Sequence, residues 1–314
     1  MWFMLLAGVL AMTQRGDPTQ AVFKSGVDLV AMSVVVTDAQ NRFVPGLSAS
    51  DFAVHEDGIE QDVSFFAASD VPLDLAVVID TSASMTDKIT RLQHAATGLA
   101  ATMRVTDRIC VVEIKGAVRT LYKKGSDVRA AIDAIRATQP SGATSLFNGL
   151  YIMLKELARE GRTGGVRRQA IVVFSDGEDT TSVVTFDDLL DAARRAGVAL
   201  YTITLKPPKP AHDAPQARDV GSVHRPQIDY AMRALAQETG GRAFFPTTID
   251  ELAGIYDGIA AELAHQYVIG YVSNSPPRNG AYRRVMVRVT QPALRAHARS
   301  GYVAGRAESA PAVR

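Results

Sequence analysis

Apolar residues follow two different periods along this chain, and the change between them divides it into regions. Between residues 71 and 265, continuous apolar runs such as LDLAVVI at 73–79 and AIVVF at 170–174 alternate with segments in which apolar residues recur every three or four positions. Continuous runs are typical of strands buried on both faces, and the longer period is typical of amphipathic helices. We therefore expect an α/β fold there, with a Rossmann-like doubly wound, mostly parallel sheet.

This alternation also predicts where the individual elements lie. Ile89, Leu92 and Ala96, for example, share one face of a predicted helix. A proline-rich segment at 206–226 interrupts the alternation and is predicted to be an exposed loop, because such a density of prolines breaks regular structure. The other predicted elements are strands at 108–114 and 198–205 and helices at 128–135, 146–157, 186–195, 228–238 and 249–264.

Alternating apolar and polar residues mark shorter strands on both sides of this region. On the N-terminal side they lie at 27–37, 52–54 and 63–66, and on the C-terminal side at 266–272 and 282–290. Neither flank has enough strands to be stable alone. We therefore expect the N- and C-terminal strands to pack together as one small flanking β module beside the α/β region.

The chain begins with a short apolar run, WFMLLAGVLAM at 2–12, of the size of a signal-peptide core. It is too short to span a bilayer, and no Lys or Arg precedes it, so a buried strand and an incomplete start are alternatives. We favour export, to the periplasm, the cell envelope or the medium. The predicted organisation is a signal peptide and joint at 1–20, an N-terminal β region at 21–70, the α/β domain at 71–265, C-terminal strands at 266–306 and a tail at 307–314.

Composition narrows the class of protein. The chain has 314 residues, of which 47% are apolar and 21% charged, and a formal net charge of +1. These values are ordinary for a soluble globular protein, and the charge balance gives no reason to expect nucleic acid as a partner. The single cysteine, Cys110, lies in an apolar run and is predicted to be buried, and one cysteine cannot form a disulfide within the chain.

Three polar segments carry the candidate chemistry. They read DTSAS at 80–84, GAT at 142–144 and SDG at 175–177. The first and third directly follow apolar runs, and loops at the carboxyl ends of parallel strands converge at one edge of a sheet. Hydroxyl and carboxylate oxygens are suitable ligands for a small hard cation such as Mg2+. The three segments therefore predict a divalent-cation site.

The combined pattern D-x-S-x-S, T and D resembles the metal-ion-dependent adhesion site of the von Willebrand factor A family. The resemblance implies that Ser82 and Ser84 bind the cation directly and Thr144 directly or through water, whereas Asp80 and Asp176 act mostly through water. It also implies Mg2+ as the cofactor, with Mn2+ or Ca2+ as alternatives. Two neutral hydroxyl ligands leave the cation electrophilic, and an Asp or Glu carboxylate of a protein partner can fill its open position.

Both flanks resemble one bacterial subgroup of this family, found especially in acidobacteria. The subgroup pattern V-x-D-x-x-x-R-x-V-x-G-L is present at 36–47, and D-F-x-V-x-E-D-G-x-x-Q at 51–61. On the C-terminal side, the QYxxGY strand of the subgroup matches 266–271 and its RxGY element matches 299–302. The resemblance thus extends beyond the predicted α/β domain.

Other chemistries fit the same residues less well. Asp80 and Ser82 are also favoured as helix caps. A haloacid-dehalogenase-type phosphatase would use Asp80 as its nucleophile, but it needs an acidic residue two positions later, where this chain has Ser82. No G-x-S-x-G elbow surrounds the serines, the six histidines show no metal-binding spacing, and no nucleotide-binding glycine motif follows a strand. We therefore expect no enzymatic activity.

A run without acidic residues, 274–307, contains seven arginines. It predicts either a solvated strand face protected against edge pairing or a patch that binds an anionic envelope surface, such as lipid head groups or polysaccharide. Two acidic residues beside Asp176, Glu178 and Asp179, are further candidates for tuning the cation. The arginines are Arg278, Arg283, Arg284, Arg288, Arg295, Arg299 and Arg306.

These features together predict an exported, non-enzymatic protein that captures an acidic group of a protein partner through its cation. The alternative is a structural or assembly factor of the envelope, whose cation only stabilises the fold. The two differ in whether the cation keeps an open coordination position for a partner.

Overall fold

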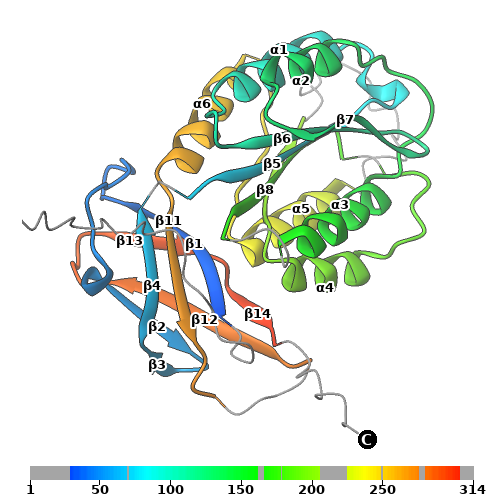
Figure 1. The fold of residues 1–314 in the computed structure, drawn as a ribbon. Helices are drawn as coiled ribbons and strands as arrows, with labels where there is room; N and C mark the ends of the chain where they lie inside the picture. Colours follow the sequence, from blue (N-terminus) through cyan, green and yellow to red (C-terminus); the bar gives the residue numbers. More distant parts are fainter. Residues whose placement is uncertain are drawn as a thin grey trace, which may run out of the picture.

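Two modules make up the part of the chain that the computed structural model describes, an α/β module and a β sandwich that lie side by side (Figure 1). None of the helices in this part is both long and apolar enough to cross a bilayer. The described residues are 29–68, 71–161, 166–177, 179–205, 225–248, 250–275 and 280–304.

The continuous apolar runs form the central sheet of the α/β module. Its strands are β5 (Leu73–Asp80), β6 (Arg108–Ile114), β7 (Val118–Gly125), β8 (Arg168–Ser175), β9 (Ala199–Thr204) and β10 (Ala243–Phe244). Their order is β10-β9-β8-β5-β6-β7, and all neighbours are parallel except β7, which runs antiparallel to β6 at one edge. The central strand β5 is buried at every position, as expected for a strand covered on both faces.

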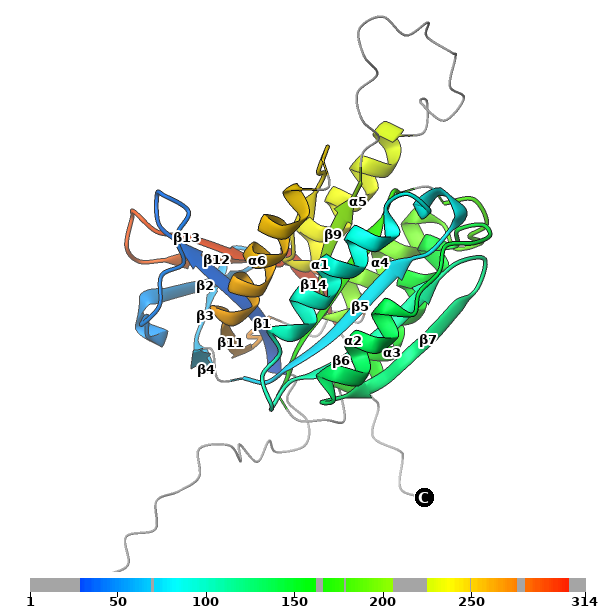
Figure 2. The same ribbon diagram turned by 90° about the horizontal axis from the view of Figure 1, so that it is seen from above.

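Helices cover both faces of this sheet, as Figure 1 shows from the side and Figure 2 from above. One face carries α1 (Ile89–Ala101), α2 (Val128–Arg136) and α6 (Glu251–Ala264), and the other carries α3 (Leu146–Gly161), α4 (Phe186–Ala196) and α5 (Arg225–Thr239). Successive side chains of a strand point to opposite faces. Leu75, Val77 and Ile79 of β5 therefore pack with α1, α2 and α6. Ala76 and Val78 pack with α3, α4 and α5.

The flanking strands form a sandwich of two four-stranded sheets. The first sheet has the order β13-β1-β11-β4, with β13 (Arg295–Ala298), β1 (Leu29–Thr37), β11 (Tyr267–Val272) and β4 (Val63–Ala68). The second has the order β14-β12-β2-β3, with β14 (Gly301–Val303), β12 (Tyr282–Val289), β2 (Phe52–Glu56) and β3 (Ile59–Gln61). Strands from both ends of the chain share one core. The predicted shared β module is confirmed.

The α/β module is inserted between two neighbouring strands of this sandwich. The last residue of β4, Ala68, is the register partner of the first residue of β11, Tyr267, so the chain leaves and re-enters the sandwich at the same point. Arg168 at the start of β8 joins the two connections. Its guanidinium donates to the backbone oxygen of Val71, in the connection from β4 to β5, at 2.9 Å. It also donates to the backbone oxygen of Leu263, at the end of α6 before β11.

Five of the described strands escaped the sequence prediction, namely β3, β7, β10, β13 and β14, and β3 and β14 have only three residues each. β10 has only two residues, and β7 and β13 are edge strands without a continuous buried face. Burial of Cys110 is confirmed. The predicted loop at 206–226 ends two residues too late, because α5 begins at Arg225. The rest of that loop, the predicted signal peptide and Glu178 lie outside the described residues.

Candidate metal site

The first two polar segments meet at the carboxyl edge of the central sheet. DTSAS begins with the last residue of β5, and GAT lies between α2 and α3. Two backbone hydrogen bonds join them, from Ala83 N to the oxygen of Gly142 at 3.0 Å and from Ser141 N to the oxygen of Thr81 at 2.8 Å. These segments, about 60 residues apart in the sequence, therefore form one surface.

The third segment, SDG, joins them from the end of β8. The hydroxyl of Ser175 donates to Oδ2 of Asp80 at 2.6 Å. Just beyond SDG, the backbone N–H groups of Thr180 and Thr181 both donate to the oxygen of Thr144 at 3.0 Å. Thr144 in turn donates its N–H to Oγ1 of Thr180 at 3.1 Å. All three predicted loops thus lie together, as their positions at the ends of parallel strands predict.

Gly177 permits the sharp turn after the third strand. Its φ of 83° lies in the left-handed region, which favours glycine. A Cβ there would lie 2.7 Å from Cγ2 of Ile228 on α5. Glycine in the SDG segment therefore lets the chain turn beside α5 immediately after Asp176.

Asp80 is fully buried, and both of its carboxylate oxygens accept hydrogen bonds. Oδ1 accepts from the backbone N–H of Ser82 at 2.9 Å, and Oδ2 accepts from Ser175. Burial raises the pKa of the Asp80 carboxyl, the hydrogen bonds from Ser175 and Ser82 lower it, and the nearby charge of Asp176 raises it, which brings it to about 6. The negative charge of Asp176 thus acts on Asp80, and a bound cation would relieve this repulsion.

The two serine hydroxyls hydrogen-bond to each other, and their spacing is compatible with neighbouring ligands of an octahedral cation. Oγ of Ser82 and Oγ of Ser84 lie 3.0 Å apart. Mg2+ binds oxygens at about 2.0–2.1 Å, so neighbouring corners of its octahedron are roughly 2.9–3.0 Å apart. Ser82 is 2% exposed and Thr144 is also buried, whereas Ser84 is exposed. The residues therefore fit a cation held from the protein side and accessible from the solvent side.

This ligand set is rich in hydroxyls and poor in charge. Among the described residues, no group of three or more His, Cys, Asp or Glu side chains is placed to hold a metal ion. The predicted residues include only two carboxylates, Asp80 and Asp176. A cation at this edge would therefore depend on Ser82, Ser84 and Thr144 for its remaining protein ligands.

Two charged residues lie close to the site, of which sequence reasoning missed one, Lys88. Nζ of Lys88 lies 2.9 Å from Oδ2 of Asp176, and no sequence pattern links residues so far apart. The other is Asp179, a candidate for tuning the cation, whose carboxylate accepts from the backbone N–H of Phe147 at 2.9 Å and of Ser182 at 3.0 Å. Asp179 therefore caps the first turn of α3 and fixes its own loop.

The C-terminal arginines do not form one uniform surface. Arg283 is 3% exposed and forms an ion pair with Glu56 inside the sandwich. Arg299 is partly buried, and its Nη2 donates to the oxygen of Ala31 at 3.0 Å. These two belong to neither predicted surface. Arg284, Arg288 and Arg295 are exposed, and Arg278 and Arg306 lie outside the described residues.

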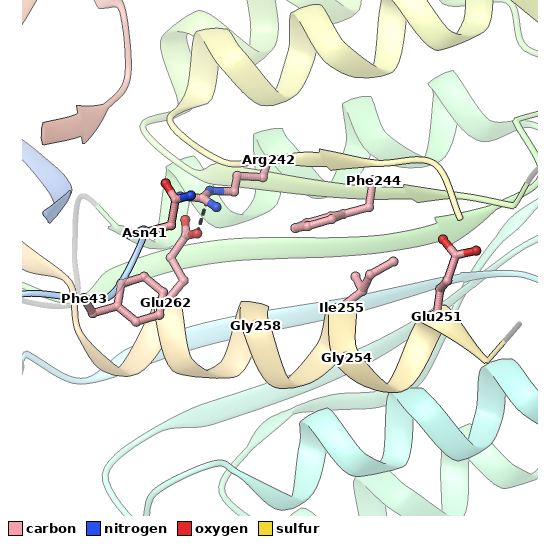
Figure 3. A pocket seen from close by; sticks show the side chains of 9 residues that line it. All are labelled: Asn41, Phe43, Arg242, Phe244, Glu251, Gly254, Ile255, Gly258 and Glu262. Carbon is pink, nitrogen blue, oxygen red and sulfur yellow. Dashed lines mark ion pairs between the residues drawn. The ribbon is translucent and has the colours of Figure 1, made fainter. Parts of the chain in front are cut away.

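A groove of about 510 Å³ marks a junction between the two modules (Figure 3). Arg242 and Glu262 form an ion pair across it, with 2.8 Å between Nε and Oε2. Glu262 Oε1 also accepts from the hydroxyl of Tyr201 at 2.9 Å. The groove thus combines an ion pair with apolar side chains such as Phe43 and Phe244, and we do not assign it as a second cation site. It is lined by Asn41, Phe43, Arg242, Phe244, Glu251, Gly254, Ile255, Gly258 and Glu262.

Comparison with known proteins identifies the inserted module. Residues 75–178 match the family model of the von Willebrand factor type A domain. The chain carries a von Willebrand factor type A (VWA) domain. The matched range includes all five predicted cation residues, and the predicted family is confirmed.

The VWA domain has relatives among bacterial proteins. A UPF0353 protein of Mycolicibacterium paratuberculosis is 26% identical over 229 residues, which are 68% of this chain and 67% of that protein. The chain thus spans about two thirds of the length of this relative. A solved von Willebrand factor type A structure from Catenulispora acidiphila has a TM-score of 0.49 at 12% identity and covers 90% of this chain and 75% of that one. Proximal thread matrix protein 1 from the mussel byssus, solved with a zinc-occupied MIDAS motif, has a TM-score of 0.46 at 13% identity, covering 66% and 49%.

Proposed function

We propose that this chain is an exported, non-enzymatic binding protein whose VWA domain captures an acidic group of a protein partner through a divalent cation. The observation that carries the proposal is the pair of serine hydroxyls 3.0 Å apart at the edge where the three loops meet. Mg2+ suits this spacing, and Mn2+ and Ca2+ are the alternatives. A bound cation would supply a positive charge with an open coordination position for a partner's carboxylate.

Hydrogen bonds from neighbouring residues hold the proposed cation ligands in position. The hydroxyl of Ser82 would be a cation ligand, and the backbone N–H of Ser82 donates to Oδ1 of Asp80 at 2.9 Å. Asp80 is in turn held by Ser175, and Thr144 is held by the loop at 179–185. Hydrogen bonds to neighbouring groups thus fix Asp80, Ser82 and Thr144 in place, which lowers the cost of ordering the loops on binding.

The same contacts favour binding over phosphatase chemistry. A nucleophilic carboxylate has to reach its substrate with a free oxygen. Asp80 is fully buried, and each of its oxygens accepts a hydrogen bond from the protein. Both facts support a structural role for Asp80 and a non-enzymatic function for the domain.

Cation binding is tested by thermal unfolding with Mg2+ or with EDTA. A ligand at one hundred times its Kd stabilises by about 2.7 kcal/mol, which is roughly 5–10 °C for a domain of this size. We expect the double variant Ser82→Ala/Ser84→Ala to remain folded and to lose this increment. Ser48→Ala/Ser50→Ala is a matched control, because those hydroxyls also form an S-x-S pair, 2.9 Å apart, but in the sandwich. An equal Mg2+ shift in both double variants would refute the site.

Partner capture separates the proposal from a purely structural cation. Envelope extract passed over the immobilised protein should yield a partner with Mg2+ and none with EDTA. Thr144→Ala should weaken this capture without unfolding the domain, because the backbone groups of Thr144 make the hydrogen bonds to Thr180 and Thr181. Mg2+-dependent stability without any Mg2+-dependent capture would favour the structural alternative. Export is tested by fractionating cells and sequencing the N-terminus of the mature protein.

A further inference from the structure

Lys88 places a positive charge on one of the predicted cation residues. Its Nζ lies 2.9 Å from Oδ2 of Asp176. The pair is largely shielded from water, because the side chain of Asp176 is 5% exposed and that of Lys88 is 24% exposed. Salt screens such a pair less than it screens a pair on the open surface.

The position of Lys88 follows from the loop that carries the serines. Its backbone N–H donates to the oxygen of Met85 at 2.9 Å, and its own oxygen accepts from Leu92 N at 3.1 Å. Lys88 therefore sits at a hydrogen-bonded junction between the 3₁₀ turn after Ser82 and the first turn of α1. One short segment thus presents both the two hydroxyls and an ammonium to the same edge of the sheet.

We propose that Lys88 is an internal counter-cation, which a divalent metal has to displace from Asp176 in order to load the site. The inference rests on the proposed function, because it concerns the regulation of the same site. An ammonium and a divalent cation repel each other at separations of a few ångströms, and here both are attracted to one carboxylate. Lys88 therefore raises the metal concentration at which the site fills.

The competition predicts opposite effects of Lys88 with and without metal. Removing the ammonium leaves the neighbouring carboxylates of Asp80 and Asp176 with one positive charge fewer. Their mutual repulsion then lowers the stability of the protein in EDTA. The same excess of negative charge attracts a divalent cation more strongly. A residue that only supports the fold would not tighten metal binding when it is removed.

The test compares Lys88→Met with Lys115→Met in the full chain. Methionine keeps the length of the lysine side chain and removes its charge. Lys115 is a matched control, because its side chain is 26% exposed and its Nζ contacts Ser141 Oγ at 3.1 Å, near the same edge, yet its ion pair is with Glu113 at 3.2 Å. Calorimetric titration with Mg2+ and with Mn2+ measures the affinities, and thermal unfolding in EDTA measures the stability.

We expect Lys88→Met to bind Mg2+ on the order of tenfold more tightly than the wild type, a difference of about 1.4 kcal/mol, and to melt at a lower temperature in EDTA. Lys115→Met should stay within about twofold of the wild type. If Lys88→Met binds Mg2+ as tightly as the wild type, or more weakly, the inference about Lys88 is overturned. Either result leaves the proposed function standing. Absence of binding in every variant, Lys88→Met included, would overturn both.

Discussion

Glu56 is predicted to make the β sandwich sensitive to acid. It is fully buried at the end of β2, where Oε1 accepts from Ser273 at 2.6 Å and from Arg283, and Oε2 accepts from Tyr271 at 2.8 Å and Tyr302 at 2.9 Å. Burial raises the pKa of the Glu56 carboxyl, but hydrogen bonds from Ser273, Arg283, Ser275 and Tyr271 outweigh burial and lower it to about 2. The charged form is therefore the one that the fold stabilises.

The size of the effect follows from the difference between the folded and unfolded pKa. A drop from the model-compound value of 4.5 to about 2 corresponds to about 3 kcal/mol at 1.36 kcal/mol per unit. Because the folded pKa is the lower one, this contribution is fully present above pH 4.5 and is lost as the pH falls towards 2. Roughly 2 kcal/mol of it should be gone at pH 3.

Urea unfolding of the wild type and Glu56→Gln at pH 7 and pH 3, followed by circular dichroism, measures this contribution. At pH 7 the variant should be less stable by on the order of 3 kcal/mol, because Arg283 loses its buried partner. Other carboxylates titrate in both proteins, so the gap between them isolates Glu56. The gap should narrow by roughly 2 kcal/mol at pH 3. A difference in unfolding free energy between wild type and Glu56→Gln that is the same at both pH values would refute the assigned role of Glu56. The control is Asp191→Asn at an exposed carboxylate, which should differ from the wild type by almost nothing at either pH.

Three further outcomes follow from the geometry. Gly177→Ala should destabilise the protein by about 1–3 kcal/mol in urea unfolding, because the new Cβ would lie at a positive φ and 2.7 Å from Cγ2 of Ile228. The control Gly98→Ala lies on an exposed face of α1 with open space at its Cβ, and it should stabilise the protein by about 0.4–1 kcal/mol. A fragment of residues 72–264 should keep the Mg2+-dependent rise in melting temperature, since it contains all five predicted cation residues. Absence of the rise would show that the site needs the sandwich. Removing residues 274–314 deletes β12, the partner of β2, so limited proteolysis should then cut within residues 29–66 that are protected in the full chain.

Periodicity was sufficient to predict the central strands, the helices and the meeting of the three loops. The runs at 73–79 and 170–174 are buried on both faces, and burial on both faces is what a continuous apolar run indicates. The carboxyl ends of parallel strands then bring Asp80 and Asp176 to one edge without any further information. The incompleteness of each flank likewise predicted that residues from both ends of the chain share a core.

Edge strands and ion pairs between residues far apart in the sequence were not predictable in the same way. β7 has a mixed pattern of exposed and half-buried residues, because its position at the sheet edge gives it no continuous buried face. Arg283 looked like one of several exposed arginines, yet its partner, Glu56, lies 227 positions away in the sequence. Lys88 and Asp176 are 88 positions apart. Contacts of this kind depend on the finished fold, and no local pattern of residue types signals them.

The insertion of the VWA domain between β4 and β11 has a consequence for the order of folding. Ala68 and Tyr267 pair in one ladder although they are about 200 residues apart, and closing so long a loop is slow and entropically costly. If the VWA domain folds first, Arg168 brings its two ends together through Val71 and Leu263. Closing a gap of about ten residues instead of about 200 saves roughly 2–3 kcal/mol of chain entropy. The VWA domain would then also bring together two strands of the sandwich, β4 and β11. A mutation of Arg168 would slow the pairing of β4 with β11.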